Sequence, residues 1–150
     1  MTKDEEFMYL ALKQADLAAL VDEVPIGCVI VKDGKPIAYG RNKREELGDP
    51  LAHAEIVAIQ KAAKVLNDWQ LVDCELYVTI EPCIMCAGAI IQSRIKRVVY
   101  GAPDKKGGAF GGSINVLDAK NINHRPIVER GVLEEECISI IQNYFKSKRK

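Results

Sequence analysis

The 150-residue sequence predicts a single α/β domain, in which helices cover a central sheet. Three observations lead to this class: a β-hairpin signal near the N-terminus, alternating helix and strand patterns after it, and a composition that is 48% hydrophobic and 28% charged. A chain of this length corresponds to one domain of roughly 100–200 residues, and no repeat, low-complexity stretch or Pro/Ser-rich linker divides it. We therefore expect residues 1–150 to form one domain.

The first elements are an amphipathic helix and a hairpin. Apolar residues recur at helical spacing from residue 3 to about residue 22, which predicts a helix. Asp33-Gly34 separates two short apolar runs, Ile26–Val31 and Pro36–Gly40, and this dipeptide favours the tight turn of a two-residue hairpin. Residues 42–49 are polar and predict a loop.

The rest of the chain alternates between helices and strands. Asp49-Pro50 predicts a helix start with Asp49 as its cap, and the body of that helix runs from His53 to Leu66. The later elements follow in order as a strand over Leu76–Ile80, a helix over Cys83–Ile91, a strand over Arg97–Tyr100, a glycine-rich loop, a strand over Ile127–Glu129 and a helix over Leu133–Lys148. Acidic residues open the last helix and basic residues close it, an order that complements the helix dipole.

Charge and hydropathy exclude several classes of protein. Lys and Arg balance Asp and Glu at 21 each, so the chain lacks the positive excess of a general DNA-coating protein, and no DNA partner is expected. Every apolar stretch is far shorter than the about 20 residues that span a bilayer, and the N-terminus lacks the layout of a secretory signal. We expect a soluble, cytoplasmic protein without a membrane partner. The five cysteines do not form an even disulfide framework.

Three residues of one pattern predict a metal site. His53 opens a helix in the sequence His-Ala-Glu, and Cys83 and Cys86 occupy Pro-Cys-x-x-Cys at a second strand-to-helix junction. Cysteines three residues apart lie on one face of a helix, and thiolate and imidazole are ligands that zinc prefers. Three protein ligands leave the fourth position of a tetrahedral ion open, which is typical of catalytic zinc sites.

Glu55, two residues after His53, is the predicted proton carrier. Zinc lowers the pKa of a bound water from about 15.7 to about 7, and a neighbouring carboxylate can accept the proton. The pattern His-x-Glu followed by Pro-Cys-x-x-Cys is the known signature of the zinc nucleobase deaminases. The predicted chemistry is therefore hydrolytic attack on an electrophilic carbon, with Glu55 as general acid and base.

Other interpretations of these residues stay open at this point. A Cys-x-x-Cys pair also fits redox chemistry, although the surroundings do not resemble thioredoxin. A fourth ligand from Cys74 or His124 would close the metal site and make it purely structural. Cys28, Cys74 and Cys137 lie in apolar stretches, and we expect them to be ordinary buried thiols.

The sequence resembles the bacterial tRNA-specific adenosine deaminases, within the cytidine deaminase-like superfamily. The matching segments are Glu23–Gly27, Asp49–Glu55, Leu76–Ala89, Ser93–Ala102 and Asn123–Arg125. The zinc pattern is shared with deaminases of free bases and nucleosides, whereas the flanking segments favour the tRNA branch. The resemblance implies a three-layer α/β/α, cytidine deaminase-like fold around a five-stranded mixed sheet, one zinc ion per subunit and a homodimer.

The resemblance also implies an activity. Adenosine at the wobble position (34) of a tRNA anticodon stem-loop would be converted to inosine, with release of ammonia. The implied zinc ligands are His53, Cys83 and Cys86, and Glu55 would carry the proton.

Four residues match substrate-contacting positions of that family: Asn42, Asp104, Asn123 and Phe145. The amide of Asn42 both donates and accepts hydrogen bonds, as contact with a base edge requires. Asp104 and Asn123 would lie near the flanking nucleotides, and Phe145 would stack on a neighbouring base. Basic residues within 146–150 would meet phosphates. The sequence departs from the family pattern at Pro103, where relatives often carry arginine, and in its short basic tail.

Two other functions compete with tRNA editing. A deaminase of a small molecule such as guanine, cytosine or a nucleoside would use identical chemistry, so the metal ligands do not discriminate against it. A non-catalytic, zinc-stabilised RNA-binding subunit would have no need of a carboxylate at Glu55. Salt-sensitive affinity for tRNA would favour the editing enzyme, and turnover of a free base would favour the small-molecule deaminase.

Overall fold

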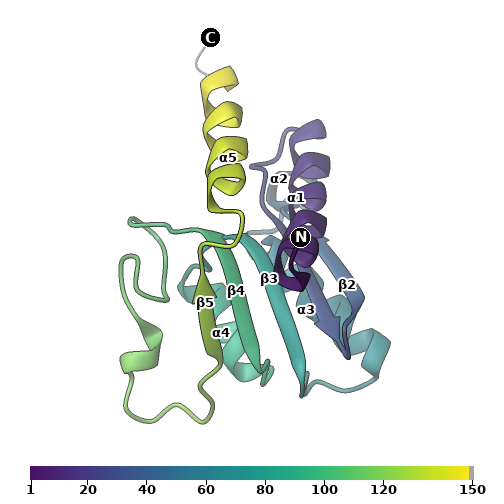
Figure 1. Ribbon diagram of the computed structural model, residues 1–150, viewed down its shortest axis with the longest axis vertical. Coiled ribbons are helices and arrows are strands. Elements are labelled where there is room, and N and C mark those ends of the chain that lie inside the picture. Colours follow the sequence, from purple (N-terminus) through teal and green to yellow (C-terminus); the bar gives the residue numbers. More distant parts are fainter. Residues whose placement is uncertain (149–150) are drawn as a thin grey trace.

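The computed structural model describes residues 1–148 and contains a five-stranded mixed sheet (Figure 1). The strands are β1 (Gly27–Lys32), β2 (Lys35–Arg41), β3 (Cys74–Ile80), β4 (Arg97–Ala102) and β5 (Ile127–Arg130). Their order in the sheet is β2-β1-β3-β4-β5. β1 pairs antiparallel with β2 and β3, whereas β4 pairs parallel with β3 and β5. The expected α/β class and mixed sheet are therefore confirmed.

Asp33 and Gly34 form the predicted two-residue turn between β1 and β2. Their φ angles are 53° and 74°, in the left-handed region that both central residues of a type I′ turn require. Directly beyond the turn, Lys32 of β1 pairs with Lys35 of β2. The sequence of the turn thus sets the register at this end of the hairpin.

Helices cover both faces of the sheet. Within residues 1–148 they are α1 (Lys3–Leu20), α2 (Arg44–Leu47), α3 (Ala54–Leu66), α4 (Ile84–Gln92) and α5 (Glu134–Lys148), with a short 3-10 turn η1 (Val116–Asp118). In Figure 1, α1 lies in front of the sheet, α3 and α4 lie behind it, and α5 rises beyond its upper edge. Parallel strands need a crossover connection, and α4 supplies it between β3 and β4.

Alternating side chains of the strands fill two cores. On β1, Cys28 and Ile30 point into the core formed with α3 and α4, while Val29 and Val31 point into the core formed with α1. This alternation follows from the two-residue period of a strand, and all four side chains are fully buried. The apolar faces of α3 and α4 are thereby fixed against the same side of the sheet.

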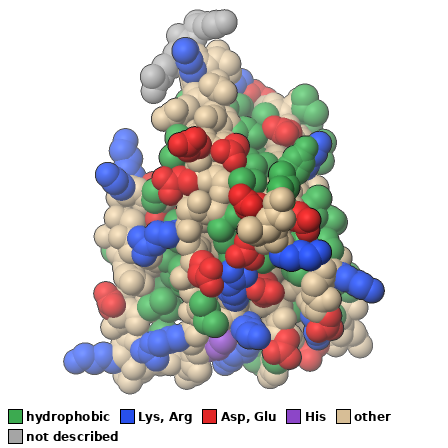
Figure 2. All heavy atoms as spheres, viewed as in Figure 1, with side chains coloured by type: hydrophobic (Ala, Val, Ile, Leu, Met, Phe, Trp, Pro, Cys, Tyr) green, Lys and Arg blue, Asp and Glu red, His purple; other side chains and the backbone are tan. Residues whose placement is uncertain are grey.

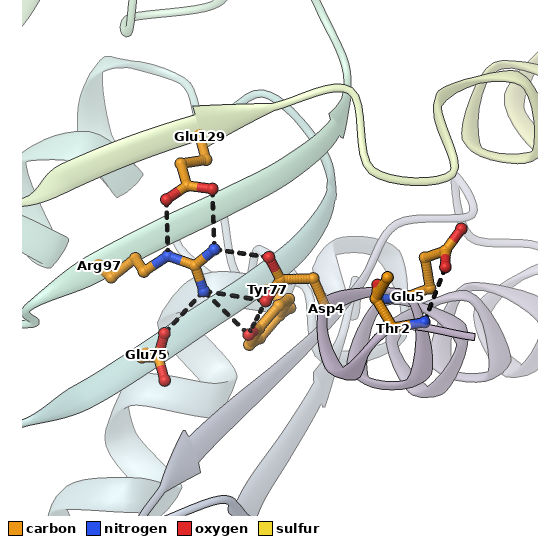
Figure 3. Close-up of polar contacts among 7 residues, drawn as sticks. All are labelled: Thr2, Asp4, Glu5, Glu75, Tyr77, Arg97 and Glu129. Atoms are coloured by element: carbon orange, nitrogen blue, oxygen red, sulfur yellow. Dashed lines mark hydrogen bonds and ion pairs between the residues drawn. The ribbon is translucent and has the colours of Figure 1, made fainter.

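A polar cluster around Arg97 fastens α1 to the sheet (Figure 3). The Arg97 guanidinium donates to Asp4 of α1 at 3.0 and 2.6 Å, and to Glu75 of β3 at 2.7 Å. It also donates to Glu129 of β5 at 3.1 and 2.9 Å. Tyr77 donates its hydroxyl proton to Asp4 at 2.6 Å. One arginine at the start of β4 therefore joins a helix to two neighbouring strands.

The expected polar loop after β2 contains the short helix α2. The cause lies elsewhere in the chain: the carboxyl of Glu23 accepts hydrogen bonds from the backbone N–H groups of Glu45 and Glu46, at 3.1 and 2.6 Å. These groups lie in the first turn of the helix, where N–H groups have no partner within the helix. A carboxyl 22 residues away in the sequence thus holds α2 in place.

The start of α3 differs from the prediction. The helix begins at Ala54, not near Pro50, and the expectation that Asp49 caps it was wrong. The Asp49 carboxyl instead accepts a hydrogen bond from the backbone N–H of Leu51 at 2.9 Å, within a local turn. This competing turn ends before the helix begins, and the residue at the N-cap position is His53.

Charged side chains are spread over the surface. Figure 2 shows acidic and basic side chains interspersed on the face that carries α1, in keeping with the balanced formal charge of the chain. In the described part of the chain, every helix is too short or too polar to cross a bilayer.

Candidate metal and substrate site

The three predicted metal ligands meet at the N-terminal ends of α3 and α4. The Nδ1 atom of His53 lies 3.7 Å from Sγ of Cys83 and 3.6 Å from Sγ of Cys86. The three donor atoms all lie within 4.8 Å of one another. Cys86 is buried, whereas His53 and Cys83 are partly exposed. The structure therefore brings together the residues that could hold a metal ion.

Local structure explains why these side chains converge. His53 is the N-cap residue of α3 and Cys83 is the N-cap residue of α4, and neither side chain caps its own helix. Both imidazole and thiol are thus free to point away from the helices that they precede. Cys86 lies one turn after Cys83 on the same face of α4. Helix N-termini also favour thiolates, because their dipoles place partial positive charge there.

The two cysteines behave as a coupled pair. Hydrogen bonding from the Cys86 thiol, with a smaller contribution from the neighbouring His53, lowers the pKa of Cys83 to about 4. The same hydrogen bond, together with burial, raises the pKa of Cys86. At neutral pH the pair therefore already carries a thiolate, the form of cysteine that binds metals.

Glu55 lies in the first turn of α3, directly behind the metal-binding residues. Its side chain is buried, with 3% of the residue exposed. Burial raises the pKa of the Glu55 carboxyl to about 7, and the nearby Cys83 adds to the rise. The carboxyl is therefore buried in the first turn of the helix that His53 precedes, and its role as a proton carrier stays a prediction.

The two residues considered as a fourth ligand lie elsewhere. Cys74 begins β3, at the end of the strand remote from Cys83. The ring of His124 hydrogen-bonds the backbone carbonyl of Ile95, which holds the loop before β5 against the start of β4. Within residues 1–148, no further His, Cys, Asp or Glu joins the group of three. The site is therefore open on one side, and the alternative of a closed structural site is wrong for these residues.

A pocket of about 630 Å³ lies against His53. Asn42, the predicted contact to the base, is part of its wall and is 7% exposed. The Asn42 amide already donates to the carbonyl of Val24 at 3.3 Å and accepts from the N–H of Arg44 at 3.2 Å. Each end of the amide keeps one further hydrogen-bonding position.

The other three predicted substrate residues do not line this pocket. Asp104 lies in the loop after β4, where its carboxyl accepts from the N–H groups of Lys106 and Gly107 at 3.0 and 3.1 Å. Asn123 is exposed in the loop before β5, next to His124. Phe145 is 44% exposed on α5, and its ring contacts that of Tyr144. Of the basic tail, residues 149–150 lie outside the described part of the chain.

Two residues of the pocket wall were missed by the sequence analysis, Glu23 and Tyr144. Glu23 is 1% exposed and holds α2, and the only signal for it was its place in the family-matching segment Glu23–Gly27. Tyr144 donates a hydrogen bond to the carboxyl of Asp22 at 3.1 Å, and its ring lies edge-on to Phe145. Adjacent aromatic residues on a helix face different directions, and only the packing of α5 shows that Tyr144 faces the pocket.

Known proteins with similar sequences and structures were compared with this chain. Residues 2–149 match the family model of the MafB19-like deaminases. The tRNA-specific adenosine deaminase of Bacillus subtilis is 47% identical over 150 residues, which is 100% of this chain and 93% of that protein. A guanine deaminase structure from the same species is 36% identical, has a TM-score of 0.66, and covers 95% of this chain and 93% of its own.

A solved tRNA:A34 deaminase, studied for A-to-I editing at the wobble position of transfer RNA, has a TM-score of 0.85. It is 46% identical, and the match covers 90% of this chain and 98% of that one. The expected deaminase fold is thereby confirmed. Because the family model, the full-length sequence match and the structural match agree, the chain belongs to the MafB19-like deaminases and, within them, to the family of the tRNA-specific adenosine deaminases.

Proposed function

We propose that this protein converts adenosine to inosine at the wobble position of a tRNA anticodon. The observation that carries the proposal is the meeting of His53, Cys83 and Cys86 beside the buried carboxyl of Glu55, next to a pocket. Relatives that are tRNA-specific adenosine deaminases support this choice of substrate.

The metal we propose is zinc, one ion per subunit, held by Nδ1 of His53 and the thiolates of Cys83 and Cys86. A tetrahedral zinc ion with Zn–N of about 2.05 Å and Zn–S of about 2.3 Å keeps nitrogen and sulfur about 3.6 Å apart. The observed N···S distances of 3.7 and 3.6 Å fit this geometry. When bound, zinc supplies a Lewis acid that lowers the pKa of water to about 7 and so provides a nucleophile at neutral pH.

Glu55 moves the protons in this proposal. Hydrolysis replaces the C6 amino group of adenine with the oxygen of water and releases ammonia. The two protons of the water therefore end on ring N1 and on the departing nitrogen. Glu55 is buried two residues after the proposed ligand His53, and its carboxyl can take each proton and return it.

The pocket next to His53 is the proposed place of the target base. Asn42 would use its two remaining hydrogen-bonding positions on the edge of that base. Asp104, Asn123 and Phe145 stay proposed contacts to the surrounding nucleotides, and the basic side chains near the end of α5 stay proposed contacts to phosphates. We propose a homodimer in the cytoplasm, where tRNA is modified, as the working form.

The test is deamination of an anticodon stem-loop that carries adenosine at position 34. The zinc-loaded protein should release ammonia and form inosine at that position. A stem-loop with its only loop adenosine moved to another position is the matched control and should not react. Lack of inosine at position 34, with intact zinc content, would contradict the proposal.

Deamination of a free base is the second candidate, because a guanine deaminase is 36% identical to this chain. Free adenosine, adenine, guanine and cytosine should be assayed in parallel with the stem-loop. Saturable turnover of one of them, together with an inert stem-loop, would favour this second function. The metal site and Glu55 would keep the same roles in either case.

A further inference from the structure

Glu81 is a second buried carboxyl near the metal-binding residues, and the proposed chemistry does not use it. It stands between the end of β3 and the Pro82-Cys83 turn, and is 2% exposed. One carboxyl oxygen accepts a hydrogen bond from the backbone N–H of Asp104 at 3.0 Å. The other accepts from the N–H groups of Phe110 and Gly112, at 3.0 and 2.8 Å. All three donors belong to the loop that follows β4.

The loop closes tightly around this carboxyl. A Cβ atom at Gly108 would lie 2.3 Å from the carboxyl carbon of Glu81, and one at Gly112 would lie 2.5 Å from a carboxyl oxygen. These separations are too short for any side chain, so both positions need glycine. The backbone N–H of Ala109 also donates to the carbonyl of Pro82 at 2.9 Å. The loop is thus attached at two successive residues, directly before Cys83.

The same loop presents charge to solvent. The Asp104 carboxyl holds a tight turn by accepting from two backbone N–H groups, and Lys105 and Lys106 in that turn are exposed. The loop that carries Lys105 and Lys106 is anchored directly before Cys83. Two positive charges held there suit contacts with the phosphates of an RNA strand that runs on from the target base. The position of these lysines relative to Cys83 depends on Glu81.

We propose that Glu81 is a positioning residue that fixes residues 103–112 beside the metal site, so that this loop binds the RNA strand next to the target base. The inference rests on the proposed tRNA substrate. A carboxylate can accept all three hydrogen bonds, and each is stronger for being made to a charged group. Without it, three backbone N–H groups lose their partner and the loop is free to move.

Glu81→Gln tests this with a side chain of the same size. A glutamine keeps one accepting oxygen but points an NH₂ group at the remaining N–H donors, so part of the anchor is lost. We expect zinc content to stay at the wild-type level and hydrogen exchange to accelerate at the amides of Asp104, Phe110 and Gly112. The KM for the anticodon stem-loop should rise about tenfold, the loss expected for one charged hydrogen bond, with kcat within about twofold of wild type.

Glu129→Gln is the matched control. It also replaces a glutamate by its amide, but its partner is Arg97 and not the loop. This variant should show unchanged KM and unchanged exchange at residues 103–112. If Glu81 only stabilises the fold, Glu81→Gln will lower the unfolding temperature and leave KM unchanged, and the proposal is then wrong. Unchanged exchange in the loop would refute it equally.

A Gly108→Ala variant approaches the same anchor from the loop side and decides the matter if Glu81→Gln does not fold. Its Cβ atom would push the loop off an intact Glu81, so KM should again rise while zinc stays bound. The failure of the proposed tRNA function can be told apart from the failure of the Glu81 proposal. If the wild-type protein does not edit the stem-loop, while the variants still show faster hydrogen exchange in residues 103–112, the tRNA function and the RNA-binding role of the loop are overturned. Glu81 then remains only an anchor of the loop.

Discussion

Glu55 and the three metal-binding residues contribute to the site in different ways. Glu55 is the proposed proton carrier and is not one of the three proposed metal ligands, so its replacement by an amide of the same shape should remove the proton carrier and leave the metal-binding frame intact. Cys83 and His53 precede two different helices, and a shared ion would connect these helices. A variant of Glu55 should therefore lose turnover alone, whereas a variant of Cys83 should lose the metal and stability as well.

Glu55→Gln should abolish turnover and leave the frame unchanged. The amide has the same shape but cannot take a proton from water, and loss of a general acid–base typically costs about 10²- to 10⁴-fold in rate. Zinc content and the unfolding temperature should stay close to the wild-type values. Single-turnover deamination of the stem-loop measures the effect, with Glu135→Gln on exposed α5 as the matched control. Full activity of Glu55→Gln would contradict the assigned role.

Cys83→Ala should lose both the metal and stability. A ligand that binds only the folded state stabilises it by about 4 kcal/mol at a thousandfold excess over its Kd, and this contribution would disappear. Metal analysis and thermal unfolding, with and without a chelator, are the measurements. Cys74→Ala is the control, because it removes a thiol at the remote end of β3, away from the proposed metal ligands. A Cys83→Ala protein with one zinc per chain would refute the ligand set.

At the scale of elements, the site is built from two helix starts and two anchored loops. α3 and α4 lie on the same face of the sheet, and each presents its N-cap residue toward the other. Buried carboxyls then fix the flanking segments, Glu23 at α2 and Glu81 at residues 103–112. Local sequence patterns indicate that helices begin near His53 and Cys83, but they do not reveal hydrogen bonds between residues that are far apart in the chain.

The Arg97 cluster gives α1 a pH-dependent attachment. Hydrogen bonds from Arg97 lower the pKa of Asp4 below its ordinary value of 3.8, against the opposing effect of burial. Because the folded state holds the lower pKa, the contribution of Asp4 to stability is complete above about pH 5 and is lost as the pH falls below the ordinary value of 3.8.

Asp4→Asn should therefore be less stable than wild type at pH 7, by about 1 kcal/mol for a partly exposed ion pair in a network. The difference should shrink as the pH falls from 5 to 3, because the Asp4 carboxyl of the unfolded chain, with its ordinary pKa of 3.8, takes up a proton before the carboxyl of the folded state does. Urea unfolding of both proteins at several pH values is the measurement. A difference that stays constant down to pH 3 would show that Asp4 does not act through its charge.

At the scale of the whole molecule, the balanced charge of the chain means that the proposed binding of RNA would depend on local contacts. The observed surface mixes acidic and basic side chains on the face that carries α1 (Figure 2). Among the residues that the structure describes, Arg44 is the one arginine or lysine of the pocket wall, and the exposed lysines proposed to meet RNA lie on separate segments, Lys105 and Lys106 after β4 and Lys146 on α5. Affinity should then come from a small number of phosphate contacts in addition to contacts with bases.

Affinity for the anticodon stem-loop should fall as salt rises. Each phosphate contact to a single strand contributes a slope of about −0.7 in log K against log salt, so a few contacts give a slope of a few units. Fluorescence anisotropy with a labelled stem-loop over a series of KCl concentrations measures it. The matched comparison is the Lys105→Ala, Lys106→Ala double variant, which should have a shallower slope. Salt-independent binding would contradict an RNA-binding surface.

The fold was largely predictable because its signals are local. The Asp33-Gly34 turn specifies a hairpin through backbone conformation alone, and alternating or helical apolar patterns specify the other strands and helices. Asp49 misled the prediction for a related reason: its side chain suits a helix cap and a turn equally well. Only the structure shows which of the two Asp49 forms: the helix begins at Ala54, and the Asp49 side chain makes the turn with Leu51.

The sequence by itself determined the proposed chemistry of the site, since His53, Glu55, Cys83 and Cys86 stand in patterns whose spacing reflects a single helical turn or a helix start. Only the tertiary structure decided what surrounds them: that Tyr144 and not Phe145 faces the pocket, that Asn123 lies away from it, and that Glu23 and Glu81 hold its neighbouring segments. The physical reason is the separation along the chain between the residues that interact. Ligand spacing depends on residues close in the chain, whereas a buried carboxyl finds its backbone partners about 20 to 30 residues away, as Glu23 and Glu81 do, and only folding brings them together.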